Sequence, residues 1–530
     1  GLMKADYVLV YKNRKLAVIE AKRVKLEVGE GVAQAKQYAK KLELAYTYAA
    51  NGKSIYQICL TTGEEGLVSS FPSPDELWNR TFGDANEWLS KFNNVPFEDV
   101  NGTKQARYYQ EIAVNRVMEA VANNKQRILL TLATGTGKTF VAFQVAWKLF
   151  QSRWNLRKDG KRTPRILFLA DRNNLASQAI RDFSAFDANA LVRINPSEIR
   201  SRGEVPMNGS VFFTIFQTFM SGAEGKPYFG DYEPDFFDFV IIDECHRGGA
   251  TEDGNWRAIL DHFSPAVQLG LTATPLKLQT NIDEHFRPFS KLVMLTSKSK
   301  KGNYFKDIIH VAQIKEMCDL GFWSPLQYES YDFDTGALVY NSTNAEFTDD
   351  SIKRAYKQQD IGGKIVKRIS ELKDRKSILV AVPSIEEAKE LSTRLPSCEA
   401  IFSGMPDSDR NQIISDFKSG KLRIIVQVTI LSVGFDHPEL DCIITGRPTA
   451  SLSWWYQFVG RVTRIHPDKA NGLVVDFVGS VPKFGKVEDL YFKYEEPLWK
   501  LYGEETKLLT GIPLHEIGLH KENQPSPHDV

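Results

Sequence analysis

A glycine-rich segment at residues 133–139, Ala-Thr-Gly-Thr-Gly-Lys-Thr, has the residue types that bind the phosphates of a nucleotide. Glycines allow backbone N–H groups to turn toward the phosphates, and a following helix adds partial positive charge at its amino end. A lysine reaches the β- and γ-phosphates of ATP, and a threonine hydroxyl binds magnesium. The candidate ATP-binding residues are Thr134, Gly135, Thr136, Gly137, Lys138 and Thr139.

The surroundings of this segment distinguish a nucleotide site from a chance glycine-rich turn. The apolar run Ile128–Leu132 precedes it, and a helical stretch, Phe140–Phe150, follows it. This strand–loop–helix order is the context that a phosphate-binding loop requires. Leu132 departs from the full GxxxxGK[ST] pattern because it stands in the place of the first glycine.

An acidic pair, Asp243 and Glu244, ends the apolar run Phe239–Ile242. At a nucleotide site, Asp243 would hold magnesium, and Glu244 would orient and deprotonate the attacking water. An acidic pair at the end of a strand is often only a solvated edge. Its position about 105 residues after the phosphate loop, within an α/β pattern, favours the catalytic interpretation.

Two arginines near the carboxyl end, Arg461 and Arg464, follow Gln457 at the spacing i, i+4 and i+7. This spacing predicts one face of a helix. Two guanidinium groups on one face could stabilise the charge that develops during phosphoryl transfer. The alternative is a solvated basic face.

Near the amino end, Asp6, Glu20 and Lys22 could form a metal-dependent phosphodiesterase site. We predict strands at Tyr7–Tyr11 and Leu16–Ala21, so that Glu20 and Lys22 point to the same face. If the turn centres on Asn13, Asp6 lies opposite Glu20, and this register requires a loop of odd length. Asp6 and Glu20 are then the magnesium ligands, and Lys22 orients the attacking water. The alternative is an ordinary solvated strand pair.

The whole chain has an α/β pattern that would position these groups. A helix is predicted at Val32–Leu44, and it presents Gln34 and Tyr38 on one side. From about residue 106, apolar strands alternate with helices, which indicates parallel sheets covered on both faces. The strands of the first series are Ile128–Leu132, Ile166–Ala170, Val211–Phe216, Phe239–Ile242 and Val267–Leu271. Those of the second are Ile378–Val382, Ile424–Val428, Ile443–Thr445 and Leu473–Val478.

The predicted domain order follows from these elements and from a polar linker at residues 91–105. We expect α/β domains at residues 1–95, 96–300 and 301–480, and an extension at 481–530. The family resemblances given below imply that the first domain is nuclease-like and that the other two are motor domains. The fold class is therefore α/β throughout.

Composition narrows the class of protein further. The 530 residues are 42% hydrophobic and 25% charged, which excludes a disordered or coiled-coil chain. The five cysteines are scattered without a CxxC pair, and no apolar stretch is long enough to span a membrane. We expect a cytoplasmic protein without a membrane partner.

The net charge of +1 hides an uneven distribution. Residues 1–60 contain eleven Lys or Arg against five Asp or Glu, and the rest of the chain has an acidic surplus of five. The basic surplus therefore lies on the segment that contains the candidate phosphodiesterase site, where it would attract phosphate groups.

The order of the motifs resembles that of superfamily-two helicases and translocases. This resemblance implies two RecA-like domains, with Gln110 reading adenine and Gly434 and Asp436 contacting the nucleotide. It also implies that Leu271–Pro275 couples hydrolysis to domain movement. The segments that carry it are Arg107–Gln110, Phe168–Arg172, Thr214–Thr218, Asp243–His246, Leu271–Pro275, Val428–Asp436 and Gln457–Arg464.

The amino-terminal pattern, with Gln34-x-x-x-Tyr38 after Glu20-Ala-Lys22, resembles the RecB-like PD-(D/E)xK nucleases. A nuclease of this kind ahead of a superfamily-two motor is the arrangement of the type I restriction endonuclease R subunit. In that family a helix precedes the position of Asp6, so we expect the nuclease domain to be truncated at its start. The family's carboxy-terminal helical region, which docks on the methyltransferase, is also expected to be largely absent.

The resemblance implies an ATP-dependent translocase and endonuclease that acts on double-stranded DNA with magnesium. Its partners would be the methyltransferase and specificity subunits of a restriction–modification complex. Two alternatives remain: a repair or replication helicase with a vestigial nuclease, and a nucleotide-dependent DNA-binding switch.

Overall fold

The computed structural model describes residues 5–83, 86–100, 102–171, 173–222, 225–246, 253–297, 304–428 and 435–518. The chain forms two compact units. Unit 1 comprises residues 1–130, 139–243 and 255–270, and unit 2 comprises residues 131–138, 244–254 and 271–530. Among the described residues, no helix combines the length and the apolar character needed to cross a membrane.

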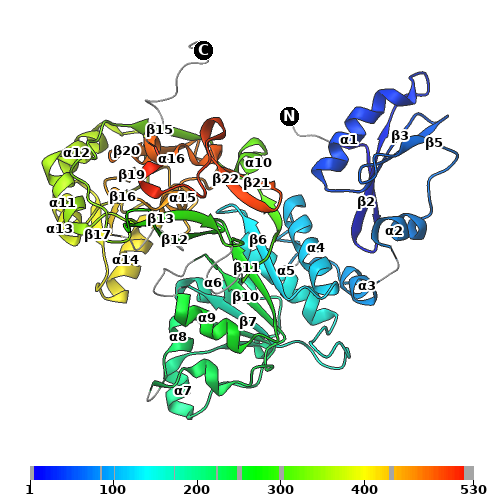
Figure 1. The fold of residues 1–530 in the computed structure, drawn as a ribbon, viewed down its shortest axis with the longest axis horizontal. Coiled ribbons are helices and arrows are strands. Elements are labelled where there is room, and N and C mark those ends of the chain that lie inside the picture. Colours follow the sequence, from blue (N-terminus) through cyan, green and yellow to red (C-terminus); the bar gives the residue numbers. More distant parts are fainter. Residues whose placement is uncertain are drawn as a thin grey trace. The chain divides into compact units, whose positions relative to one another are not determined.

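The amino-terminal part of unit 1 is a five-stranded sheet with the strand order β1-β2-β3-β4-β5 (Figure 1). The β2–β3 pair is parallel, and the other neighbouring pairs are antiparallel. A parallel pair needs a crossover connection, which helix α1 (Val32–Lys41) provides. The strands are β1 (Tyr7–Tyr11), β2 (Arg14–Ala21), β3 (Tyr46–Ala50), β4 (Ile55–Cys59) and β5 (Glu65–Val68).

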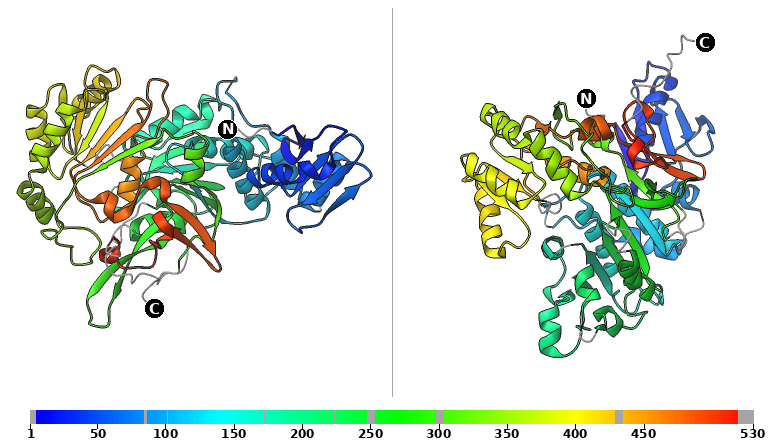
Figure 2. Two further views of the ribbon diagram at one scale, coloured as in Figure 1. Left: turned by 90° about the horizontal axis from the view of Figure 1, so that it is seen from above. Right: turned by 60° about the vertical axis from the view of Figure 1, so that its left-hand side comes forward.

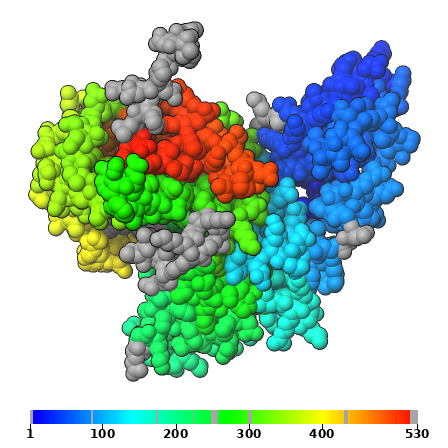
Figure 3. All heavy atoms as spheres, in the orientation of Figure 1, coloured from blue at the N-terminus to red at the C-terminus, as the bar shows by residue number. Residues whose placement is uncertain are grey.

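Two small cores hold this sheet between helices. Val18 packs with Tyr38 and Ala39 of α1, while Tyr48 packs with Trp78 of α2 (Pro74–Phe82). In the space-filling view of Figure 3, the atoms of this part, in dark to lighter blue, form one body on the face shown. Helix α3 (Glu87–Asn94) then occupies the start of the predicted linker.

The second sheet of unit 1 has the strand order β6-β11-β10-β7-β9-β8. Its strands β7, β8, β9 and β10 pair in parallel, as the alternating pattern predicts. The strands are β6 (Arg127–Leu132), β7 (Ile166–Ala170), β8 (Leu191–Arg193), β9 (Val211–Ile215), β10 (Phe239–Asp243) and β11 (Val267–Thr272). The helices are α4 (Tyr108–Ala122), α5 (Lys138–Gln151), α6 (Asn173–Asp182), α7 (Pro196–Arg202), α8 (Phe216–Met220) and α9 (Asp253–His262).

Unit 2 contains a six-stranded sheet with the strand order β15-β20-β19-β16-β18-β17, in which every neighbouring pair is parallel. Helices α11 (Asp349–Gln358), α12 (Ile361–Glu371) and α13 (Ile385–Arg394) pack on it through a shared apolar core (Figure 2). The strands are β15 (Leu326–Ser330), β16 (Ile378–Ala381), β17 (Cys398–Ile401), β18 (Ile424–Gln427), β19 (Cys442–Thr445) and β20 (Gly472–Asp476). The other helices are α10 (Ile314–Asp319), α14 (Asp407–Lys418), α15 (Leu452–Val459) and α16 (Ser480–Phe484).

Two antiparallel hairpins of unit 2 were not predicted from the sequence. They are β12 (Leu276–Ile282) with β13 (Pro288–Met294), and β21 (Tyr491–Glu495) with β22 (Leu498–Tyr502). Unit 2 also contains strand β14 (Ile308–Ala312). The parallel α/β architecture expected for both motor domains is nevertheless confirmed.

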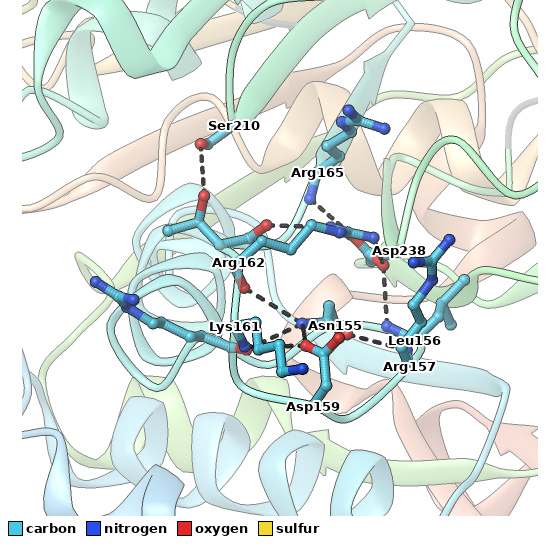
Figure 4. A network of polar contacts seen from close by, with 11 residues as sticks. Asn155, Leu156, Arg157, Asp159, Lys161, Arg162, Arg165, Ser210 and Asp238 are labelled. Carbon is cyan, nitrogen blue, oxygen red and sulfur yellow. Dashed lines mark hydrogen bonds and ion pairs between the residues drawn. The ribbon is translucent and has the colours of Figure 1, made fainter.

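A buried carboxylate, Asp238, stabilises the loop that enters β7 in unit 1 (Figure 4). It accepts two hydrogen bonds from the Arg162 guanidinium, at 2.6 and 2.9 Å. It also accepts the backbone N–H groups of Leu156 at 2.9 Å and Arg165 at 2.8 Å. Since its side chain is fully buried, these four bonds replace the water that the charge has lost.

We predict that Asp238→Ala lowers the free energy of unfolding by about 3 kcal/mol, because buried donors lose a charged acceptor. Urea unfolding, with hydrogen exchange of the 154–165 peptide as the probe, measures this free energy. In the control Asp261→Ala, the lost partner is an exposed carboxylate paired with Arg257, and we expect a change within about 0.5 kcal/mol. Equal effects of the two substitutions would contradict the role given to Asp238.

Candidate functional site

The phosphate-binding loop connects the end of β6 to the start of α5. Gly135 and Gly137 have φ angles of +82° and +88°, a conformation that residues with a Cβ atom adopt at a cost. The Thr136 hydroxyl donates to the carbonyl of Ala133 at 2.7 Å and closes the turn. The two glycines are therefore required by the backbone path of the loop.

The Arg464 guanidinium lies directly over this loop. A Cβ atom added at Gly135 would lie 1.6 Å from Arg464 Nη1. Nη1 is buried, and no hydrogen-bond acceptor for it is found among the described residues. A buried guanidinium donor without an acceptor, beside a glycine loop, is suited to a phosphate oxygen. The loop and Arg464 thus fit the phosphates of a nucleotide.

Glu244, the second residue of the acidic pair, also lies at this loop. Lys138 Nζ is 3.1 Å from Glu244 Oε1, so the lysine that would bind phosphate is paired with the carboxylate that would activate water. Glu244 has a φ of +51°, an uncommon and strained conformation for a non-glycine residue that is often found at functional sites. Asp243, at the end of β10, is 7% exposed.

A histidine that the sequence analysis did not select joins this group. His246 Nδ1 lies 2.8 Å from Thr272 Oγ1 and 3.4 Å from Glu244 Oε2. The Gln457 side-chain amide donates to His246 Nε2 at 2.9 Å. His246 ends the motif Asp243–His246, and Thr272 lies in the motif Leu271–Pro275. Both residues could therefore have been selected from the motifs.

The predicted helical face for Gln457, Arg461 and Arg464 is wrong. Helix α15 ends at Val459, and the chain continues in tight turns in which Arg461 N–H donates to the carbonyl of Phe458 at 3.1 Å. Both arginines therefore lie beyond the helix, in a turn that we call the arginine turn (residues 461–464). Contacts made by the turn orient the two guanidinium groups, and the periodicity of a helix does not predict these contacts.

The two arginines bind the end of the motif segment at residues 428–436. Arg461 Nη1 donates to the carbonyl of Phe435 at 2.8 Å, and Arg464 Nε donates to Asp436 Oδ1 at 2.8 Å. Desolvation raises the pKa of Asp436, but the ion pair with Arg464 and the charge of Arg461 outweigh it, so that this pKa lies below its usual value.

Two aromatic residues hold the peptide groups of Thr134, and neither was selected from the sequence. The Thr134 N–H donates to the Tyr456 hydroxyl at 3.2 Å, and the Trp323 indole N–H donates to the Thr134 carbonyl at 2.9 Å. Gly460 approaches the same residue, since an added Cβ would lie 2.9 Å from Thr134 Cγ2. No motif in the sequence pointed to Trp323.

Three of the remaining candidate residues lie in unit 1, and one lies outside the described residues. The Gln110 side chain accepts the N–H of Arg107 at 2.9 Å and caps α4, so its role toward adenine stays a prediction. Thr139 stands in the first turn of α5 and Asp243 at the end of β10, where they were expected. Gly434 lies outside the described residues.

We predict that Gly460→Ala lowers the ATP hydrolysis rate by about tenfold, because the new methyl group pushes the arginine turn away from Thr134. Steady-state phosphate release measures the rate. The control Gly230→Ala places a methyl group in open space and leaves the rate unchanged. Unchanged hydrolysis in Gly460→Ala would show that the close approach has no role.

At the amino-terminal site, the prediction of a loop of odd length is wrong, but the strand register still aligns Asp6 with Glu20. Tyr11 pairs with Arg14, so the turn has two residues, Lys12 and Asn13, both with positive φ angles. A bulge then shifts the register between Leu9 and Val10, and Tyr7 pairs with Ile19. The extra residue in β2 has the effect of an odd loop, because it restores the alignment of Asp6 with Glu20.

The side chains of this site form a continuous chain of contacts. Lys22 Nζ donates to Glu20 Oε1 at 2.8 Å and to Gln34 Oε1 at 3.1 Å. The Gln34 amide donates to the Tyr38 hydroxyl at 2.9 Å. Asp6 Oδ2 accepts the N–H of Ala21 at 2.8 Å, which places this carboxylate beside the end of β2.

The carboxylates of this site suit a divalent cation. Glu20 is 3% exposed, and its Oε2 atom has no hydrogen-bond partner among the described residues. A buried carboxylate oxygen without a donor is a ligand that magnesium could use. No group of three or more His, Cys, Asp or Glu suited to a metal occurs in the described parts of the chain, so two carboxylates would have to suffice.

We predict that Glu20→Gln lowers the pKa of Lys22. The hydrogen bond that Lys22 donates to Glu20 is the main cause that raises this pKa above its ordinary value, and burial opposes it. Nuclear magnetic resonance titration of the labelled lysine measures the change. Glu27→Gln, in the exposed loop after β2, is the control, and we expect it to leave the pKa of Lys22 unchanged. An unchanged Lys22 titration in Glu20→Gln would contradict the pairing.

Three family models match the chain. Residues 103–277 match the model described as "Type III restriction enzyme, res subunit", and residues 363–466 match the helicase conserved C-terminal domain. Residues 2–63 match the second domain of the type I restriction enzyme EcoKI endonuclease subunit.

Curated relatives and a solved structure agree with these matches. The chain is 31% identical to the type I restriction enzyme EcoAI endonuclease subunit of Escherichia coli, over 87% of this chain and 58% of the relative. It is 24% identical to the EcoKI endonuclease subunit of Escherichia coli K12, over 88% and 46%. The chain thus spans about half the length of the curated relatives it matches.

The solved structure is a fragment assigned as an HsdR subunit of a type I restriction enzyme from Vibrio vulnificus YJ016. The similarity has a TM-score of 0.71 at 30% identity, and it covers 91% of this chain and 84% of that one.

Proposed function

The chain belongs to the family of endonuclease (HsdR) subunits of type I restriction enzymes, and we propose that it hydrolyses ATP to translocate double-stranded DNA and then cleaves phosphodiester bonds. The observation that carries the ATP-dependent part is the Arg464 guanidinium, whose buried Nη1 atom lies beside Gly135 and has no hydrogen-bond acceptor in the described parts of the chain. Phosphate groups would supply that acceptor.

The ATP-binding step follows from the Lys138–Glu244 pair. On arrival of the nucleotide, the Lys138 ammonium exchanges its carboxylate partner for the β- and γ-phosphates. This exchange frees Glu244 to accept a proton from the attacking water. The strained backbone of Glu244 keeps the carboxylate at the loop while its partner changes.

The arginine turn supplies charge at the transition state. Arg461 and Arg464 leave Phe435 and Asp436 and donate to the γ-phosphate as its bond to the β-phosphate breaks. Magnesium held by Thr139 and Asp243 would neutralise charge on the β- and γ-phosphates. Gln110, Gly434 and Asp436 complete the proposed nucleotide contacts.

The nuclease step uses the contacts around Lys22. Its ammonium, held by Glu20 and Gln34, orients a water molecule toward the phosphorus atom. The water oxygen bonds to phosphorus as the bond to the 3′ oxygen breaks, and the proton that the water loses passes to the leaving 3′ oxygen. Magnesium held by Asp6 and Glu20 would stabilise the charge on the phosphate oxygens. The basic surplus of residues 1–60 attracts the DNA backbone to this site.

The proposed partners are double-stranded DNA and the methyltransferase and specificity subunits of a restriction–modification complex. Those subunits would recognise the target sequence, and this chain would move and cut the DNA. The proposed place of action is the cytoplasm.

A reconstituted complex with its methyltransferase and specificity subunits separates the two activities. Lys138→Ala should reduce ATP hydrolysis and displacement of a triplex-forming strand by at least about 1,000-fold. Asp6→Ala should abolish cleavage of a supercoiled plasmid and leave ATP hydrolysis unchanged, as should Glu20→Ala. The control Glu27→Ala should retain both activities.

Other outcomes would favour the alternative functions. Cleavage that survives in Asp6→Ala and Glu20→Ala would remove the nuclease from the proposal and favour a helicase with a vestigial nuclease. Hydrolysis without triplex displacement would favour a nucleotide-dependent switch.

A further inference from the structure

Lys469 contacts the arginine turn through its ammonium group and is only 9% exposed. Among the described residues, all the hydrogen-bond acceptors of its ammonium are backbone carbonyls. They belong to Arg464 at 2.6 Å, Val462 at 2.9 Å, Leu440 at 2.9 Å and Pro438 at 3.4 Å. An ammonium has three N–H donors, so the three short contacts use all of them.

These carbonyls belong to two segments that are distant in the sequence. Pro438 and Leu440 follow the motif segment at residues 428–436, and Val462 and Arg464 belong to the arginine turn. Ser324 also binds the turn, since its hydroxyl donates to the Arg464 carbonyl at 2.7 Å. Lys469 therefore connects the backbone of the turn to the backbone of residues 438–440.

The arginines connect nearly the same segments but cannot do so throughout the reaction. Arg461 binds the Phe435 carbonyl and Arg464 binds Asp436. According to the proposed function, both guanidinium groups give up these partners when they bind the γ-phosphate. The contacts of Lys469 involve only backbone carbonyls and do not depend on the nucleotide.

We propose that Lys469 is a positioning residue for ATP hydrolysis, which holds the arginine turn in place while Arg461 and Arg464 move from the protein to the phosphate. This inference rests on the proposed function. Burial lowers the pKa of Lys469 to about 8. The charge of Asp441 opposes this shift, and the charges of Arg464 and Arg375 add to it. At neutral pH the ammonium therefore keeps its three donors.

The test measures ATP hydrolysis by the full chain in its complex with DNA. Lys469→Ala should lower kcat about 100-fold, because a small misplacement of catalytic groups has effects of that size. KM for ATP and the affinity for fluorescent ADP should change less than about threefold, since the phosphate loop is intact. Lys469→Met keeps the aliphatic stem and should show the same loss, which separates the ammonium from the packing of its stem.

Chemical rescue provides a result that a purely structural role would not give. The missing atoms of Lys469→Ala correspond to n-propylammonium, which should restore kcat at least about tenfold. Neither 1-propanol, which has one donor, nor tetramethylammonium, which has charge without donors, should restore it.

Lys483 is the matched control. Burial lowers its pKa to about 8 as well, and it donates to the Tyr340 hydroxyl at 2.9 Å. Lys483→Ala should leave kcat per folded molecule unchanged, with folded protein counted by ADP binding. Equal kcat losses in the two alanine variants, or unchanged kcat in Lys469→Ala, would overturn the inference. Absence of DNA-stimulated hydrolysis in the wild-type complex would instead overturn the proposed function.

Discussion

The close approach of the Arg464 guanidinium to Gly135 is the contact on which the candidate ATP site depends. A Cβ atom at residue 135 would displace this guanidinium, whose buried Nη1 atom has no hydrogen-bond acceptor among the residues that the structure describes. A buried donor without an acceptor is unfavourable by about 1–3 kcal/mol, and more when charged. An anionic ligand relieves that cost, so the arrangement favours the binding of phosphate.

Other features of unit 2 follow from this approach. Helix α15 ends at Val459, and the tight turn after it brings Arg461 and Arg464 toward the loop. Gly460 allows the contact with Thr134, whose peptide groups are held by Tyr456 and Trp323. Gly460, Tyr456 and Trp323 act by fixing the path of the backbone. A search of the sequence for reactive side chains therefore does not select them.

The amino-terminal site depends on a different constraint, the two-residue period of a strand. One extra residue moves every later side chain to the other face, so a single bulge decides whether Asp6 faces Glu20. Glu20, Lys22, Gln34 and Tyr38 were each selected from the sequence by type and spacing. Their direct contacts, by contrast, depend on helix α1 crossing over the parallel β2–β3 pair.

The sequence by itself determined the elements whose signal is local. The apolar run Ile166–Ala170 is strand β7 to the residue, and the order of the phosphate loop and acidic pair follows from composition and spacing. The hairpin β21–β22 was missed because its mixed aromatic and charged residues have no clear alternation. Only the tertiary structure decided the end of α15, the bulge in β2, and the burial of Lys469 among four carbonyls. These features depend on contacts between residues far apart in the chain, and local periodicity contains no information about such contacts.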